Sequence, residues 1–302
     1  MQAENRTVQV NLRLAPSLKD AAERAAERDH RSLTSLIEKL LSEHIDNAPS
    51  LDDWHARAQV RFGDLLEKHK VARPLGALAR SYAIKCAEHT EISPIQLLAI
   101  LQKVHSELKH LSSSHHIAYP YTRQEMRPYF TSDKALERGA DIEILECFAG
   151  PPLISETDFW RASPSGYLTD VRTIFEDHAD VRQVGMEPGQ FLSPVLLSYR
   201  LQEVVLHAVL LAMKFSTAQT IEFRCEWTGL KGRGLRDLRP GIPWPVDNSS
   251  RVDGRVTGGE WSISELKKDW AIAASALGAP ILRLFDPTFD YSSNWIHREL
   301  QS

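Results

Sequence analysis

The clearest pattern in the chain is a strict alternation of apolar and polar residues close to the N-terminus, at residues 7–14. One set of alternate positions is apolar: Val8, Val10, Leu12 and Leu14. The other set is polar: Thr7, Gln9, Asn11 and Arg13. Because successive side chains of a strand point to opposite faces, this period of two predicts a half-buried β-strand.

Two amphipathic helices are predicted directly after this strand. Pro16 is typical of a first helical turn, and the apolar residues that follow it recur at spacings of three and four up to about residue 29. Ser32 is a suitable N-cap for a second helix with the same pattern through Ile45. One strand cannot pair its own backbone groups, and two short helices leave apolar faces uncovered, so the segment predicts a dimer.

Antiparallel pairing of the two strands would give a ribbon with one polar face, and a ribbon of this kind fits the major groove of B-DNA. That face would present three base-reading candidates from each chain: Gln9, Asn11 and Arg13. Arg pairs with guanine, whereas Asn and Gln pair with adenine. At the start of the second helix, backbone N–H groups and three hydroxyl residues suit a DNA phosphate: Ser32, Thr34 and Ser35.

These residues resemble the ribbon-helix-helix family of the Arc/MetJ class, and most closely its Arc-like members. The resemblance rests on residues 9–14, Pro16 and residues 31–37, and it covers about residues 1–46. It implies an intermolecular two-stranded ribbon, two helices and a homodimer that reads double-stranded DNA with the strand residues named above. Pairing of dimers into tetramers on DNA stays open. One departure is His30, at a turn position where the family usually has glycine.

The overall charge excludes strong non-specific attraction to a polyanion. The 302 residues contain 36 Lys+Arg and 40 Asp+Glu, which gives a formal net charge of −4. Binding of DNA would therefore depend on local contacts.

Two further features predict a cytoplasmic protein without a membrane segment. The three cysteines form no CxxC pair, which favours packing thiols in a reducing compartment over a disulfide framework. The most apolar stretch, residues 195–215, is interrupted by Arg200, Glu203 and His207.

The remaining chain predicts an α+β fold. Turn-forming residues and Pro49 predict a linker at 47–52, followed at 53–302 by a helical connector and a larger α+β domain. Helices are predicted at 53–70, 75–89, 94–111, 194–215 and 264–277, the last between a Ser264 cap and Gly278. Strands are predicted at 141–148, 220–228, 255–263 and 281–285. The apolar positions of 94–111 fit a dimer seam or, in preference, a core-facing helix.

About 150 C-terminal residues more faintly resemble bacterial regulators that carry a Schlafen/AlbA-like domain. The matching segments are 159–164, 221–230 and 259–261. The resemblance assigns no chemical role to them.

Motifs for common nucleophile, zinc and nucleotide sites are absent from the sequence, so we predict no catalytic residue, metal or cofactor. Two groups could ligate a metal but are explained more simply by solvated positions: Asp141, Glu143 and Glu146, and His105, His110, His115 and His116. The glycine-rich loop 229–239 is a candidate anion-binding loop, with a solvated turn as the simpler interpretation. Its basic residues are Lys231, Arg233, Arg236 and Arg239.

Together these patterns predict a dimeric bacterial transcriptional repressor whose C-terminal domain senses a ligand or a partner. One alternative is an antitoxin, or a defence or plasmid-maintenance interaction protein, that autoregulates its operon. Another is a DNA-targeted enzyme, such as a nuclease or a nucleotide-processing enzyme, that would use Glu222, Glu226 or Asp141.

Overall fold

The computed structural model divides the chain into two compact units, Met1–Ala48 and Pro49–Ser302. It describes residues 15–29, 31–37, 49–88, 90, 92–111, 128–133, 142–150, 157–178, 181–182, 185–237 and 248–301. The strand predicted at 7–14 lies outside these residues, so the ribbon stays a prediction. The division between the units falls within the interval 47–52, and the last two residues of that interval are already helical.

The smaller unit contains the first predicted helix and the start of the second, whose remaining residues 38–45 lie outside the described part of the chain. Helix α1 spans Pro16–Arg28, with Pro16 in its first turn. A second helical segment follows at residues 33–37, where Ser32 Oγ accepts a hydrogen bond from the Ser35 backbone N–H at 3.1 Å. Ser32 is therefore an N-cap, as predicted.

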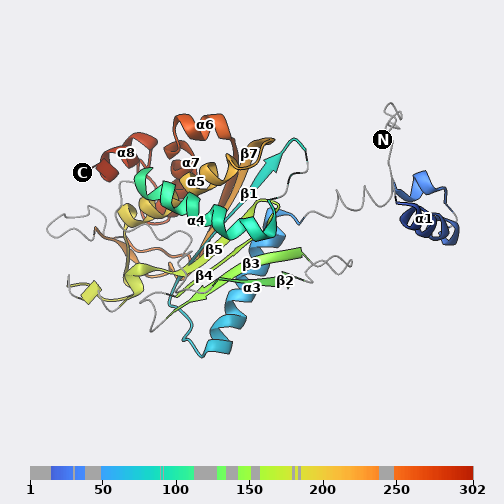
Figure 1. Cartoon of the computed structure of the whole chain (residues 1–302). Helices are drawn as coiled ribbons and strands as arrows, with labels where there is room; N and C mark the ends of the chain where they lie inside the picture. Colours follow the sequence, from blue (N-terminus) through green and yellow to red (C-terminus); the bar gives the residue numbers. More distant parts are fainter. Residues whose placement is uncertain are drawn as a thin grey trace. The chain divides into compact units, whose positions relative to one another are not determined.

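In the larger unit, the described strands form an antiparallel sheet in the order β2-β3-β4-β5-β1-β7-β9 (Figure 1). Their bounds are β1 Ala77–Cys86, β2 Tyr129–Asp133, β3 Ile142–Ala149, β4 Asp158–Ala162, β5 Tyr167–Thr173, β7 Ala218–Trp227 and β9 Arg255–Ser262. Two short strands, β6 Phe191–Leu192 and β8 Gly234–Leu235, pair in parallel beside it. The mixed α+β class predicted from the sequence is confirmed.

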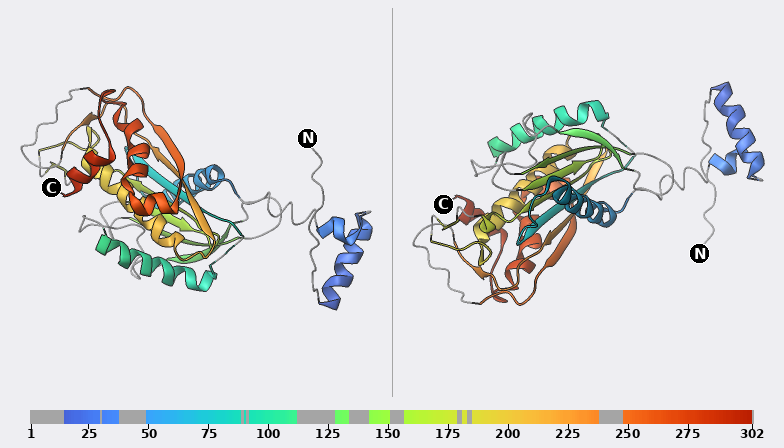
Figure 2. Two further views of the ribbon diagram at one scale, coloured as in Figure 1. Left: turned by 90° about the horizontal axis from the view of Figure 1, so that it is seen from above. Right: turned by 90° about the horizontal axis from the view of Figure 1, so that it is seen from below.

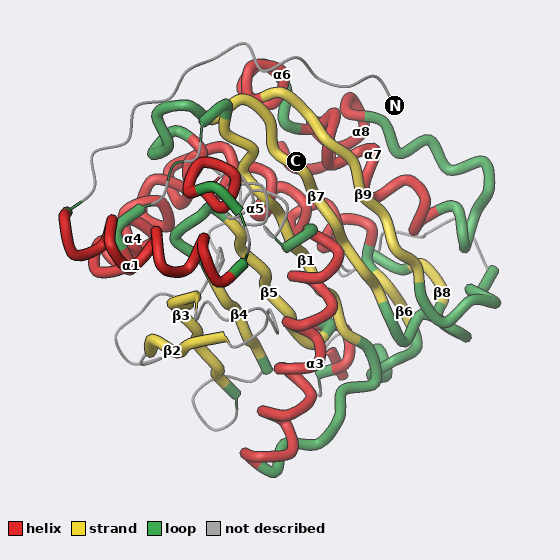
Figure 3. The backbone as a smooth tube through the Cα atoms, turned by 90° about the vertical axis from the view of Figure 1, so that its right-hand side faces the viewer, coloured by secondary structure: helices red, strands yellow, loops and turns green. Residues whose placement is uncertain are grey.

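The helices cover the two faces of the sheet unequally. Their bounds are α3 Leu51–His69, α4 Pro94–Leu111, α5 Pro194–Ala212, α6 Ile263–Lys268, α7 Ala271–Leu282 and α8 Ser293–Gln301. Helix α3 packs on β4, β5, β1 and β7 from one side and crosses in front of the strands in Figure 3. Helices α4, α5 and α7 pack together over the other face (Figure 2), where the largest apolar core lies.

Helix α5 is long and apolar enough to cross a membrane by length and composition, and is the only such helix in the described part of the chain. However, 78% of its apolar window is buried inside the fold. It also carries buried Glu203 and His207. These features are those of a central core helix.

Two predictions of element type in the larger unit were wrong, one of them because of burial on both faces. Residues 75–89, predicted to be helical, form β1. Its alternate residues pack toward α5 (Leu78, Tyr82) or toward α3 (Ala79, Ala83), so both faces are buried. Such a strand has no clear period of two and is hard to distinguish from a helix. Residues 281–285, predicted as a strand, are the end of α7 and the turn after it.

The helix predicted at 264–277 is divided in two. Its first part, α6, is capped by Ser262 rather than Ser264, through a capping box with Glu265. Gly278 lies inside α7 rather than at a helix end. A glycine is needed at this position because a Cβ there would clash with Tyr291. The predicted range 94–111 is a helix, and its residues Leu97, Leu101, Val104 and Leu108 belong to the core, as in the preferred interpretation.

A network of buried charges fixes α5 to the sheet. Arg80 Nη2 on β1 donates to Asp170 Oδ1 on β5 at 2.8 Å, and its Nη1 donates to Glu203 Oε2 on α5 at 3.2 Å. Arg172 Nη2 donates to Asp170 Oδ2 at 2.8 Å and to Asp158 Oδ2 at 3.0 Å. All five side chains are at least 97% buried. Each charge faces an opposite one, which offsets the cost of removing it from water.

We expect Asp170→Asn to lower the free energy of unfolding by about 3–5 kcal/mol, because it leaves two buried arginines without their shared carboxylate. All seven tryptophans lie in the larger unit, so tryptophan fluorescence in urea follows that unit alone. The control is Arg182→Gln, whose ion pair with Glu187 is exposed and should contribute less than about 1 kcal/mol. Equal losses for the two variants would contradict the role given to the network.

Candidate functional site

The predicted DNA-contacting residues fall into a described and an undescribed group. Gln9, Asn11 and Arg13 lie outside the described residues. The structure brings Ser32, Thr34 and Ser35 together in the first turn of the second helical segment, with Ser32 and Thr34 exposed. This turn has the exposure that a phosphate contact requires.

Arg233 is not available to an anion, which corrects its assignment to the candidate anion-binding loop. It is 1% exposed and forms a two-pronged pair with Asp177, at 2.6 and 2.9 Å. It also donates to the carbonyl oxygen of Phe191 at 3.2 Å. The loop glycine Gly229 approaches the backbone of Leu75, where a Cβ would clash. The loop is thus held to the protein by packing and an ion pair.

Of the other basic residues in this loop, Lys231 and Arg236 are exposed, and Arg239 lies outside the described residues. The metal candidates are likewise not assembled. Glu146 and His105 are buried rather than solvated, while Asp141, His115 and His116 and the Glu143 side chain lie outside the description. No cluster of three or more ligating side chains occurs among the described residues.

A row of polar residues crosses the sheet beneath α3. The six strands from β2 to β7 across the sheet each contribute one residue in register: Tyr129 (β2), Glu146 (β3), Arg161 (β4), Thr169 (β5), Ser81 (β1) and Arg224 (β7). Apolar rows flank it under α3, with Phe159, Val171 and Ala79 on one side and Ile144, Tyr167 and Ala83 on the other. We call the six residues from Tyr129 on β2 to Arg224 on β7, without these flanking apolar residues, the polar row.

Helix α3 supplies partners for the polar row at successive turns. The Trp54 ring lies 4.5 Å from the guanidinium carbon of Arg161. His55 Nδ1 lies 2.7 Å from Ser81 Oγ. One and a half turns later, Arg61 Nε donates to Glu146 Oε2 at 3.2 Å. The helix therefore satisfies polar groups that its own apolar packing would otherwise leave buried and unpaired.

Ser81, His55 and Glu226 have the connectivity of a serine–histidine–acid triad without the access that catalysis needs. His55 Nε2 lies 3.3 Å from Glu226 Oε2, on the opposite side of the ring from Ser81. Ser81 is fully buried, and its hydroxyl is held between His55 and Thr169, at 2.7 and 2.6 Å. Burial also lowers the pKa of His55, which favours the neutral ring. The group acts as a structural link between α3 and the sheet.

At its β2–β4 end, the polar row opens into a groove of about 410 Å³. The groove is lined by α3 (Ala56, Arg57, Val60, Arg61 and Asp64) and by the sheet (Thr131, Glu146 and Arg161). Its deepest charged groups are Glu146 and Arg161, which are 2% and 3% exposed. This volume lies in the range of small-molecule sites. We call it the arginine groove.

The arginine groove could not be predicted from the sequence because the residues of the groove come from four elements. Two of these elements, β2 and β4, were not predicted. Residues 57, 61 and 64 share one face of a predicted helix, which is the only local signal. Their meeting with Glu146 and Arg161 depends on the register of the sheet.

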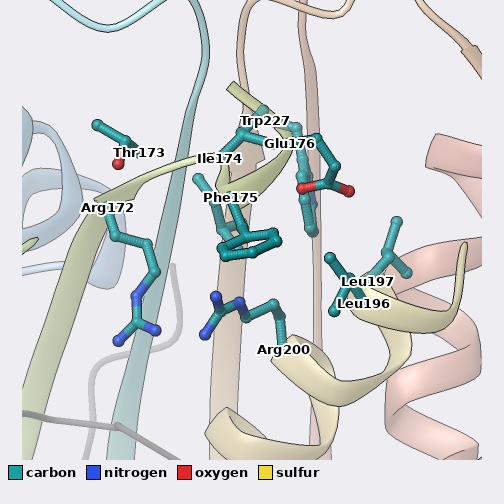
Figure 4. Close-up of a pocket in the computed structure, with 10 residues that line it drawn as sticks. Arg172, Thr173, Ile174, Phe175, Glu176, Leu196, Leu197, Arg200 and Trp227 are labelled. Atoms are coloured by element: carbon teal, nitrogen blue, oxygen red, sulfur yellow. The ribbon is translucent and has the colours of Figure 1, made fainter. Parts of the chain in front are cut away.

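A second cavity lies between the sheet and α5, around Glu176 (Figure 4). At about 10 Å³ it has room for roughly one water molecule. Glu176 is 3% exposed and accepts a hydrogen bond from the Ser193 backbone N–H at 2.8 Å. Burial raises the pKa of Glu176 to about 7. The cavity is too small for a metabolite, so we assign Glu176 to stability rather than to binding.

Comparison of the chain with protein-family models, curated proteins and solved structures gave no match.

Glu176 predicts a pH dependence of stability. Its pKa in the folded state is raised from 4.5 to about 7, so the folded protein keeps a proton that the unfolded chain has lost. This contribution is present below about pH 4.5 and is lost as the pH rises through about 7. We expect the free energy of unfolding to fall by up to about 3 kcal/mol over this range, relative to Glu176→Gln. Urea titrations of both proteins at several pH values measure the difference; parallel pH profiles would refute the assignment.

Proposed function

We propose that this protein is a homodimeric, sequence-specific DNA-binding protein that acts as a transcriptional repressor. In this proposal the smaller unit binds DNA, and the larger unit senses a small molecule or a partner. The observation that carries the proposal is the arrangement of the smaller unit: an alternating segment, helix α1, and a second helical segment whose N-cap, Ser32, is exposed.

The small amount of apolar burial in the smaller unit supports the dimer. Of its described side chains, only Ala26 and Leu36 are buried within a single chain, while Leu18 of α1 is 56% exposed. A unit of 48 residues whose described part buries so little apolar surface would gain stability from further burial. A second copy would supply that burial and also the partner strand for the ribbon.

Exposed polar groups at the second helical segment support the contact with DNA. Ser32 and Thr34 are exposed at a helix start, where backbone N–H groups and the helix dipole favour an anion. With a net charge of −4 on the chain, affinity would come from such local contacts and from base reading.

Repression would result from occupancy of the operator. Two large units in one dimer would constrain the spacing and orientation of the DNA-reading parts. A ligand that prefers one arrangement would then shift DNA affinity by its differential affinity for the two states.

The dimer can be tested with Leu18→Glu, which places a charge at an apolar position of α1 that is 56% exposed in a single chain and that a second copy would cover. We expect sedimentation at micromolar concentration to show a dimer for the wild type and a monomer for this variant. Tryptophan fluorescence should show an unchanged melting of the larger unit. Glu23→Gln on α1 is the matched control and should stay dimeric. A monomeric wild type would refute the proposed function.

Base reading can be tested after selecting the operator from genomic fragments and footprinting it. At one fixed salt concentration, Arg13→Ala and Asn11→Ala should each weaken operator binding by about 1–3 kcal/mol and relax base preference. Ser32→Ala should weaken binding to all DNA sequences alike, because a phosphate contact does not depend on the base. Uniform losses for all three variants would contradict these roles.

A further inference from the structure

The arginine groove carries more positive than negative charge. Three arginines line it, Arg57, Arg61 and Arg161, against two carboxylates, Asp64 and Glu146. We propose that this groove binds a small organic anion whose oxyanion group, a phosphate ester or a carboxylate, contacts the arginines. The proposal rests on the proposed function in that it names the ligand class of the sensing unit.

The arrangement of the arginines favours an anion between them. Arg57 and Arg61 stand four residues apart on one face of α3, where two like charges destabilise a helix. Arg161 lies beneath them on β4 and is directly opposite Glu146 in the sheet. Glu146 serves two of these arginines, with Arg61 Nε at 3.2 Å and Arg161 Nε at 3.8 Å. One carboxylate thus faces more than one positive charge.

Arg61 keeps donor capacity for a ligand. Its Nε is committed to Glu146, but a guanidinium carries five N–H donors in a planar fork that matches carboxylate and phosphate oxygens. The side chain is still 36% exposed where it lines the groove. Glu146 and Trp54 hold Arg61 and Arg161 in place, which lowers the ordering cost of binding.

The apolar residues of the groove set the shape of the remaining part of the ligand. Ala56 and Val60 of α3 line the same groove, and Val60 is 67% exposed. An apolar or aromatic group next to the oxyanion would cover this surface and gain from its burial. The volume of about 410 Å³ exceeds what an inorganic ion fills.

The position of the groove on α3 gives a route to regulation. Helix α3 begins at Leu51, directly after the division between the two units at Ala48 and Pro49. A ligand that holds α3 against β2–β4 would stabilise one position of the helix that continues from the linker. Such a ligand can affect the smaller unit only if it binds one position of α3 more tightly than another.

The proposal can be tested by calorimetric titration of the full-length protein in the absence of DNA. The probes are phenyl phosphate, benzoate and phenol, which differ in the charged group but share the ring. We expect saturable binding of phenyl phosphate or benzoate, and the stronger of the two identifies the oxyanion source. Phenol should bind at least about ten-fold more weakly, because it lacks the charge-assisted hydrogen bonds.

Variants locate the site. Arg61→Gln and Arg57→Gln should each weaken binding of the anionic probe by about ten-fold, the value of one charge-assisted hydrogen bond. Glu146→Gln should strengthen it, because the amide oxygen can still accept the hydrogen bond from Arg61 while the competing negative charge is removed. This gain cannot result from partial unfolding. Arg182→Gln, in an exposed ion pair outside the groove, should leave it unchanged. Tryptophan fluorescence confirms that each variant is folded.

Two outcomes would overturn the proposal. One is the absence of binding by either anionic probe at concentrations up to about 10 mM. The other is binding without specificity for the site: phenol binds as tightly as the anionic probe, or the two arginine substitutions leave the affinity for the anionic probe unchanged. Because DNA is absent, these outcomes leave the DNA-binding function standing. Conversely, anion binding by a protein without operator affinity would refute only the proposed function.

Discussion

The structure of the larger unit depends on one constraint: charged groups buried between the sheet and its helices need partners of opposite charge. On the α5 side, Arg80 and Asp170 are fully buried and connect three elements by charge-assisted hydrogen bonds. On the α3 side, the polar row runs between two apolar clusters and is paired by residues of the helix. Apolar contacts alone would let α3 slide along the sheet; the pairs of His55 with Ser81 and of Arg61 with Glu146 fix its position.

The same constraint explains where a binding site is available. On β1, inside the polar row, Ser81 is enclosed by His55 and Thr169, and no surface remains for a substrate. At the β2–β4 end, the row reaches the arginine groove, where Arg61 is partly exposed. A buried pair at the base of an open groove gives fixed donors with access to solvent. That combination is what recognition of a small anion requires.

The described residues of the smaller unit show the opposite feature, little apolar burial within one chain. Within one chain, α1 leaves Leu18 largely exposed, and only Ala26 and Leu36 are buried among the described residues of this unit. Association of two copies is the physical solution available to a segment of this size. The proposed repressor would therefore combine a part that is stabilised by pairing with a part that has a large core of its own.

The sequence alone determined the features that depend on local rules: Pro16 at the start of α1, the Ser32 cap, the mixed α+β class and the amphipathic helix at Pro94–Leu111. The sequence did not predict β1, because burial on both faces removed the alternation of apolar and polar residues. It also did not predict that Arg233 is buried, because its partner Asp177 comes from a distant segment. Only the tertiary structure decided the polar row and the arginine groove. Their residues meet through strand register, and no local pattern encodes which residue of one strand lies opposite which residue of the next.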